Sequence, residues 1–519
     1  MMPDALGVAL GLLPQYLAWH VLLSAAALAL GLLISLPLAV VAYRRPRLRW
    51  PALAFAGTAQ TIPSIAMLAL FFPVLLAVSA LSSKVFGHGF SALGFLPALL
   101  ALALYSMLPI LRTAITGLTG IDPAVIEAAR GVGMTDQERL TMVELPLAAP
   151  VIMAGVRTAA VWTIGAATLA TPVGQTSLGN FIFSGLQTEN WVFVLVGCAA
   201  SALLALAADQ LLGLIERGLA KRSARRIQIG VGGIALGVVL AILPLVMTLG
   251  GGAYTVGAKN FSEQYVLAEL MAGRLEAKGG KVSRREDLGS AIAYRALAAG
   301  EVDVYVDYTG TLWTGVLGRT DNPGREVGLK TLTEELRKRD DVIVLGSLGF
   351  ENAYALAMKR QEAARLGIKN LTDLTLVAPS LTLGADLEFL QRPEWESLRQ
   401  KYAFAFRAQR QFQPTFMYRA LDDGAADVIT AFSSDGRIAA NDLVTLGDPK
   451  SALPPYDAVI LISPKKAHDA RLLSTLRPLL GAVSVEAMRK ANYAVDRTDG
   501  EKKTPAASAA ALAAEIGVK

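Results

Sequence analysis

The hydrophobic positions of this 519-residue chain form two different patterns, which meet near residue 253. Before that point lie long stretches without Asp, Glu, Lys or Arg, among them 5–43, 51–83, 85–111, 158–188, 190–208 and 227–258. About 20 apolar residues in a helix cross the hydrocarbon core of a bilayer. The pattern therefore predicts six membrane spans, near residues 19–43, 52–80, 93–113, 147–171, 191–213 and 228–249.

The second pattern, from Tyr254 onward, consists of short β-like runs that alternate with helical stretches rich in Ala, Leu and Glu. The β-like runs are YTVGA, VDVYVDY, VIVLG, ADVITAF and DAVILIS. Such alternation is typical of an α/β domain. We therefore expect residues 1–226 to form a transmembrane domain, 227–253 the sixth helix and a linker, and 254–519 a separate α/β domain.

Basic residues in the short loops predict the orientation of the spans. RRPRLR (residues 44–49) follows the first span and KRSARR (residues 221–226) follows the fifth, so both loops should be cytoplasmic. Six spans then place the α/β domain outside the cell. The segment between spans three and four must lie in the cytoplasm.

That cytoplasmic segment, IDPAVIEAARGVGMTDQERLTMVELPLAAP, resembles the coupling loop of ABC importer permeases. The matching residues are Glu127, Ala128, Ala129, Gly133, Val143, Leu145 and Pro146. The resemblance implies a short helix, a turn that glycine permits and a second helix, which together dock on an ATPase. An ordinary amphipathic surface helix is the simpler alternative.

The energy source is expected to lie on another chain. The sequence contains no G-x-x-x-x-G-K-[ST] phosphate-binding loop, so a separate ATPase subunit should be the partner. ABC importers use two coupling loops and this chain has one, which favours a homodimer. A secondary transporter is the alternative, but the spans carry no series of acidic or basic proton-relay residues.

A hidden repeat indicates that the α/β domain has two lobes. YRALAAGEVDVYVDYT (residues 294–309) returns as YRALDDGAADVITAFS (residues 418–433). Each copy reads as a helix, a glycine and a strand that ends in an aromatic residue. Two such lobes closing on a ligand form a hinge-bending receptor, in which Tyr308 and Phe432 should face one another across the cleft.

Six ordered blocks of the α/β domain resemble the osmoprotectant-binding proteins, which take glycine betaine, choline, carnitine and related quaternary ammonium compounds, with one branch that handles ergothioneine. The blocks are GAKNFSEQYVLAEL, VDVYVDYTGTLW, ENAYAL, LGADLEFLQRPEW, AFSSDGRI and PPYDAV. The resemblance implies the fold of a type II periplasmic binding protein. Combined with the spans, it predicts an all-α permease of six helices followed by a two-lobed α/β binding domain.

The same resemblance implies the binding residues. Four aromatic rings enclose the trimethylammonium group in that family, and by motif they are Tyr308, Tyr354, Phe432 and Tyr456. Rings suit this ligand because a quaternary cation has no N–H to donate and is recognised chiefly by π-faces. The implied carboxylate-binding residues are Lys259, Thr311 and Arg392, with Asn260, Glu388 and Asp435 as neighbours or orienting groups. A helix-surface ion pair between Glu388 and Arg392, four residues apart, is the simpler reading of those two.

Composition and charge reduce the number of functional classes to which the protein could belong. The net charge of +6 is compatible with orienting basic loops, so nucleic acid is not an expected partner. With one cysteine and three scattered histidines, the chain is not expected to hold a metal ion. No cofactor and no set of catalytic residues are expected near the cleft. We expect an importer subunit in the bacterial plasma membrane, in contact with lipid and specific for a small quaternary ammonium solute. An importer for another zwitterion, such as an amino acid, and a non-transporting ligand receptor are the alternatives.

Overall fold

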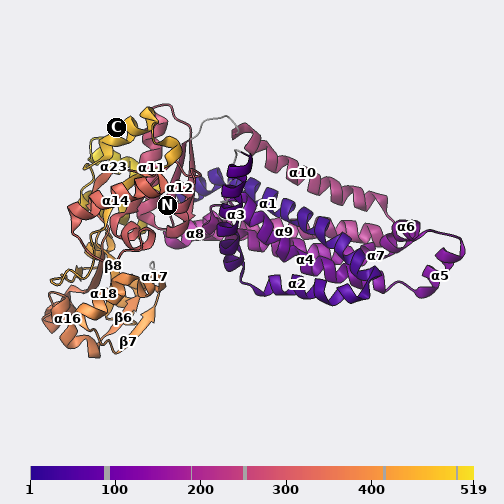
Figure 1. The fold of residues 1–519 in the computed structure, drawn as a ribbon, viewed down its shortest axis with the longest axis horizontal. Coiled ribbons are helices and arrows are strands. Elements are labelled where there is room, and N and C mark those ends of the chain that lie inside the picture. Colours follow the sequence, from indigo (N-terminus) through magenta and orange to yellow (C-terminus); the bar gives the residue numbers. More distant parts are fainter. Residues whose placement is uncertain are drawn as a thin grey trace. The chain divides into compact units, whose positions relative to one another are not determined.

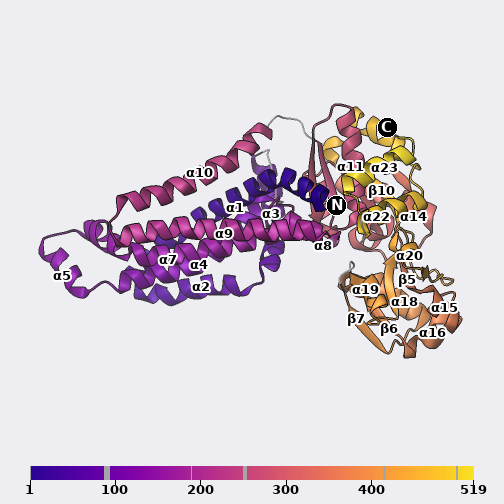
Figure 2. The same cartoon turned by 180° about the vertical axis from the view of Figure 1, so that it is seen from behind.

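The computed structural model describes residues 2–86, 90, 94–188, 190–248, 254–412, 416–497 and 501–518. The chain divides into two compact units (Figures 1 and 2). The first is made by Met2–Phe183 and Trp191–Gly251, and the second chiefly by Gly252–Lys519. We call them the membrane unit and the binding unit.

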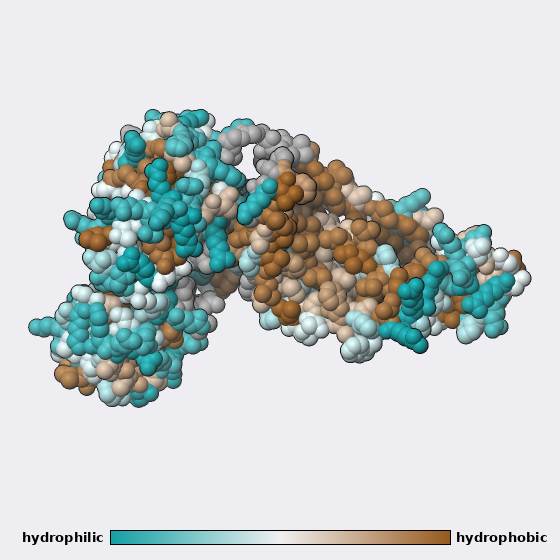
Figure 3. Space-filling model, in the orientation of Figure 1, coloured by the Kyte–Doolittle hydropathy of each residue, from teal (hydrophilic) through white to brown (hydrophobic). Residues whose placement is uncertain are grey.

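The membrane unit is helical throughout its described residues. Its helices are α1 (Met2–Arg44), α2 (Arg49–Thr61), α3 (Ser64–Phe86), α4 (Phe95–Thr119), α5 (Pro123–Gly131), α6 (Asp136–Arg139), α7 (Leu145–Ala167), α8 (Gly179–Gln187), α9 (Trp191–Ala220) and α10 (Ala224–Thr248). Within the described part of the chain, six helical segments are long and apolar enough to cross a membrane. Figure 3 shows hydrophobic residues over these helices and hydrophilic residues over the end that carries α5 and α6. The predicted six-helix domain is confirmed.

The second predicted span, 52–80, is wrong in its bounds because the chain breaks at Pro63. α2 ends at Thr61, Ile62 has an extended backbone (ψ 128°), and α3 begins at Ser64. Proline disfavours the helical conformation of the residue before it. α3 thus provides the span alone, while α2 packs its alanines Ala52, Ala56 and Ala59 against α4.

The binding unit contains two five-stranded sheets, one in each lobe. Lobe 1 has the order β2–β1–β3–β10–β4 and lobe 2 the order β7–β6–β8–β5–β9. In lobe 1 the strands are β1 (Tyr254–Lys259), β2 (Val282–Leu288), β3 (Val304–Tyr308), β4 (Ile343–Glu351) and β10 (Asp457–Ile462). In lobe 2 they are β5 (Tyr354–Lys359), β6 (Thr382–Ala385), β7 (Ala408–Gln411), β8 (Val428–Phe432) and β9 (Leu443–Thr445).

The two sheets have the same topology. In each, three parallel strands are followed by an antiparallel strand, β10 or β5. β10 joins the lobe 1 sheet although it follows all of lobe 2 in sequence. The chain therefore crosses between the lobes twice, from β4 to β5 and from β9 to β10. Two crossovers form a double hinge, and the predicted two-lobed α/β fold is confirmed.

Helices cover both sheets of the binding unit. They are α11 (Ser262–Ala277), α12 (Ser290–Ala298), α13 (Thr309–Thr311), α14 (Arg325–Asp340), α15 (Arg360–Leu366), α16 (Leu371–Val377), α17 (Leu387–Gln391), α18 (Pro393–Tyr402), α19 (Met417–Asp422), α20 (Arg437–Ala440), α21 (Ala470–Leu476), α22 (Val485–Asp496) and α23 (Pro505–Glu515). α11 is the most deeply buried of the long ones and packs against β1, α22 and α23.

The sequence repeat corresponds to equivalent elements of the lobes. One copy is α12 and β3, and the other is α19 and β8. Gly300 and Gly424 occupy the same turn, with φ of 69° and 67°, a left-handed conformation that glycine adopts without penalty. The repeated aspartates Asp303 and Asp427 each accept a hydrogen bond from the first parallel strand of their sheet, at Thr255 N and Thr382 N. The repeat thus fixes how β3 and β8 are placed.

Candidate functional site

A cavity of about 300 Å³ lies between the two lobes, where the carboxyl ends of parallel strands from both sheets meet. Open α/β sheets commonly bind ligands at this edge. Its walls within the binding unit are formed by Lys259, Asn260, Phe261, Ser290, Tyr308, Thr311, Asn352, Tyr354, Asp386, Arg392, Phe412, Phe432 and Tyr456. Eight of the ten residues predicted to bind solute are among them.

Aromatic rings from both lobes form one continuous wall of this cavity. The Tyr354 ring centroid lies 4.8 Å from that of Phe432, its cross-strand neighbour, and 5.6 Å from that of Tyr456. The rings of Tyr308 and Phe432 were expected to face one another directly, but they do not. The ring of Phe261 lies between them, 6.2 Å from Tyr308 and 6.5 Å from Phe432, and is roughly parallel to both. The sequence analysis missed this fifth ring.

Two of the tyrosines are held in place by buried carboxylates. The Tyr308 hydroxyl donates to Glu263 Oε1 at 2.5 Å and accepts from Gln264 Nε2 at 3.0 Å. The Tyr456 hydroxyl donates to Glu394 Oε1. Burial raises the pKa of both phenols well above its usual range. Both hydroxyls therefore stay protonated, and both rings are fixed at their outer ends.

Two cationic side chains lie on the wall beside the rings. Lys259, 2% exposed, forms an ion pair with Asp307, and its Nζ is 5.4 Å from the Tyr308 ring centroid. The Arg392 guanidinium donates to Glu394 at 3.2 Å and lies 5.4 Å from the Tyr354 ring centroid. Lysine and arginine carry three and five donor hydrogens, so each can bind a protein carboxylate and still donate to an anionic ligand group.

The remaining polar residues differ in position. Asn260 follows β1 and Thr311 ends α13, and both line the cavity. Asp435 lies behind the aromatic wall, in a smaller cavity of about 60 Å³, where it pairs with Arg437 at 2.8 Å. The backbone of Glu388 is part of α17, but its side chain lies outside the described residues.

The local backbone does not place Glu388 and Arg392 on one helix surface. α17 ends at Gln391, and Arg392 is extended (φ −86°, ψ 152°). Arg392 pairs with Glu394, at the start of α18. The extended residue turns the guanidinium toward the cavity.

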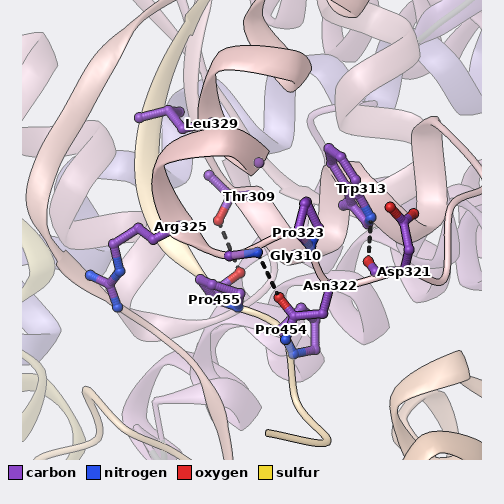
Figure 4. A pocket seen from close by; sticks show the side chains of 12 residues that line it. Thr309, Gly310, Trp313, Asp321, Asn322, Pro323, Arg325, Leu329, Pro454 and Pro455 are labelled. Atoms are coloured by element: carbon purple, nitrogen blue, oxygen red, sulfur yellow. Dashed lines mark hydrogen bonds between the residues drawn. The ribbon is translucent and has the colours of Figure 1, made fainter.

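A third hollow, of about 20 Å³, is lined in part by Thr309, Gly310 and Trp313 (Figure 4). This volume suits about one water molecule and no solute. Figure 4 shows the contacts that close it: Thr309 Oγ1 donates to Pro455 O at 3.0 Å, and Trp313 Nε1 donates to Asp321 O at 2.8 Å. This region is therefore a support that fixes α13 and, with it, Thr311.

The segment predicted to couple with an ATPase has the expected local form. α5, which carries Glu127, Ala128 and Ala129, is followed by Gly133 with φ of 82° and then by α6. A π-helical turn leads from α6 to Leu145 and Pro146 at the start of α7, so force on the segment would be transmitted to α7. Arg139 braces the turn by pairing with the buried Glu144 at 2.7 Å.

Comparisons with known proteins agree with both units. Residues 252–514 match the family model "Substrate binding domain of ABC-type glycine betaine transport system", and residues 27–221 match "Binding-protein-dependent transport system inner membrane component". The chain belongs to the ABC importer permeases that are fused to a betaine-type substrate-binding domain.

Relatives of this family cover either the whole chain or one unit. The ergothioneine transport permease/ergothioneine binding protein EgtU of Helicobacter pylori (strain G27) is 29% identical over 488 residues, covering 90% of this chain and 84% of the relative. The choline transport system permease protein OpuBB of Bacillus subtilis (strain 168) is 38% identical over 209 residues, covering 40% of this chain and 89% of the relative. A crystal structure of a glycine betaine/carnitine/choline ABC transporter is 28% identical, with a TM-score of 0.46, and covers 51% of this chain and 99% of that one.

Proposed function

We propose that this chain is the membrane subunit of an ATP-driven importer whose binding unit captures a quaternary ammonium betaine. The observation that carries the proposal is the wall of five aromatic rings contributed by both lobes. A trimethylammonium group cannot donate a hydrogen bond, and each well-placed ring face stabilises it by about 0.5–2 kcal/mol. The ligand would complete a site that neither lobe forms alone.

The polar end of the cavity supports a ligand carboxylate. Lys259, Thr311 and Arg392 all line the cavity, and charge-assisted hydrogen bonds to a carboxylate are stronger than neutral ones. We assign Asn260, Asp435 and Glu388 supporting roles. Glycine betaine, choline, carnitine and ergothioneine are the solute candidates.

ATP hydrolysis is assigned to a separate nucleotide-binding subunit that docks on α5 and α6. Support comes from apolar side chains left exposed on this segment, with Val132 77% and Met142 66% accessible. Exposed apolar groups beside polar ones mark protein interfaces. Two copies of the chain would supply the two docking segments of one transporter, as a homodimer.

We place the transporter in the bacterial plasma membrane with its binding unit on the extracytoplasmic side. The basic loops after α1 and α9, at residues 44–49 and 221–226, are the support for this orientation. Residues 1–226 and the sixth helix with its linker, 227–253, would serve transport. Residues 254–519 would serve capture.

A comparison of a cation with its neutral isostere tests the proposed substrate class. Tyr308→Leu keeps bulk but removes the π-face, so the full chain should bind a trimethylammonium ligand about 1–2 kcal/mol more weakly, roughly 5- to 30-fold. A tert-butyl analogue should bind poorly to the wild type and change little in the variant. Phe406→Leu, which removes a ring outside the cavity, is the matched control.

The analogue decides between cation recognition and simple burial of apolar surface. Burial alone predicts that the neutral analogue binds at least as well as the cation. Equal calorimetric affinities of the wild type for both ligands would therefore refute the quaternary ammonium assignment.

A further inference from the structure

Two buried carboxylates lie directly behind the aromatic wall without lining the cavity. Glu263 is 3% exposed and Glu394 is 2% exposed. Glu263, on α11, accepts the hydroxyl hydrogen of Tyr308, and Glu394, on α18, accepts that of Tyr456. Neither carboxylate is therefore a ligand-contacting group of this cavity.

The charge environments of these carboxylates differ. Glu394 is paired with the Arg392 guanidinium, which compensates its charge. The partners described for Glu263 are all uncharged donors: Tyr308 Oη, Asn352 Nδ2 at 2.9 Å and Asn492 Nδ2 at 2.7 Å. Glu263 is thus a buried carboxyl with no cationic partner in the described part of the unit.

The set of donors favours the ionised form of Glu263. Burial raises the pKa of Glu263 above its usual range, and the hydrogen bonds from Tyr308, Asn492 and Asn352 oppose part of that rise. The amide nitrogens Asn352 Nδ2 and Asn492 Nδ2 can only donate, and each meets an oxygen of Glu263, as a carboxylate requires. The hydrogen-bond geometry is that of a carboxylate.

We propose that Glu263 determines the selectivity of the cavity for a permanent cation, acting through Tyr308. Donation of the phenol hydrogen to a carboxylate increases electron density on the ring, which makes its face more attractive to a cation. The uncompensated negative charge adds a direct attraction, which is stronger in the low-dielectric interior than in water. A neutral ligand of the same shape gains from neither effect, so Glu263 is a positioning and specificity residue that makes no ligand contact.

This inference rests on the proposed function, and the test separates the two. The full chain in lipid nanodiscs is titrated with glycine betaine and choline, and with their isosteres 3,3-dimethylbutanoate and 3,3-dimethylbutan-1-ol, in which an uncharged tert-butyl group replaces the trimethylammonium group. Glu263→Gln keeps the shape of the side chain and removes its charge. We expect affinity for the cations to fall about 10-fold, while affinity for the isosteres changes less than about twofold.

Two further variants make the result specific. Glu269→Gln removes a carboxylate of the same helix that pairs with Arg284 away from the cavity, and it should leave both affinities unchanged. Tyr308→Phe keeps the ring and cuts the hydrogen bond, so it should also reduce the preference for the cation. In the Tyr308→Phe background, Glu263→Gln should have a smaller effect than it has alone, because part of its action passes through the hydroxyl.

Each outcome has one meaning. Equal losses for cation and isostere in Glu263→Gln would show a structural role and overturn the inference, as would an unchanged preference. If Glu263→Gln does not fold, Tyr308→Phe decides, and an unchanged preference in that variant overturns the inference. A wild-type chain with no preference for the cations would instead refute the proposed function.

Discussion

Gly310→Ala tests whether the aromatic wall depends on a close approach between α13 and a ring. A Cβ at position 310 would lie 2.5, 2.6 and 2.7 Å from the Cζ, Cε2 and Cε1 atoms of Tyr456. Real Cβ contacts are not this short. The backbone of Gly310 is not left-handed, so alanine would cause no conformational strain there and the effect would be purely steric.

Tyr456 has little freedom to move away. It is 1% exposed, and its hydroxyl is bonded to Glu394. Overpacking of this kind costs about 1–3 kcal/mol, which corresponds to a fall in Tm of roughly 2–10 °C for a unit of this size. Displacement of one ring should also weaken binding of a trimethylammonium ligand by about 0.5–2 kcal/mol, roughly 2- to 30-fold.

Calorimetric titration and thermal unfolding of the full chain measure both effects. Gly273→Ala, in α11 where a Cβ would meet no atom within 4 Å, is the control and should preserve or raise stability. Adding Tyr456→Leu to Gly310→Ala should relieve the clash, so the Tm losses of the two changes should be less than additive, while affinity for the cation is not restored. Normal Tm and normal affinity in Gly310→Ala would refute the packing argument.

Two other predictions concern coupling and pH. Gly133→Asp places a charged side chain at the exposed turn between α5 and α6. Solute binding should persist, while uptake and transport-stimulated ATP hydrolysis are lost. Normal uptake in vesicles that contain the ATPase would contradict the docking assignment. Burial raises the pKa of Asp496 to about 6. The contribution of this residue to the free energy of unfolding is therefore present below about pH 3.9, the pKa of an unfolded Asp. It is lost as the pH rises through about 6, a change of about 3 kcal/mol. The Tm of Asp496→Asn should therefore exceed that of the wild type by more at pH 7.5 than at pH 5. An equal difference at both pH values would contradict this prediction.

Hydrophobic patterning predicted strands whose two faces are covered. The runs identified in the sequence became β1, β3, β4, β8 and β10. It missed β5 (YALAMK), the short strands β6 (TLGA) and β9 (LVT), and two others, β2 (VSRREDL) and β7 (AQRQ), whose sequences are mostly polar. β2 and β7 are edge strands of their sheets, where polar and charged side chains face solvent and discourage pairing with other chains. Their pairing depends on a neighbour far away in the sequence, which no local pattern reports.

The residues of the candidate site also fall into those that the sequence predicted and those that it did not. The cleft-lining tyrosines could be predicted because each stands in a block that resembles a known family. Phe261, Glu263 and Glu394 stand in the same blocks, yet their positions follow from tertiary contacts. Phe261 is placed by stacking on two rings from different lobes, and the carboxylates are placed by tyrosines 45 and 62 positions away in the sequence. Sequence spacing contains no information on such pairs.

The double crossover gives these contacts a consequence for lobe closure. Asn352 lies on the crossover from β4 to β5, and it donates to Glu263 of lobe 1. Tyr456 lies on the returning crossover, and it donates to Glu394 of lobe 2. Each hinge segment is thus hydrogen-bonded to a carboxylate next to the aromatic wall. A ligand that orders this wall would also stabilise one arrangement of both hinges, since binding can shift a conformational equilibrium only through contacts that differ between its states.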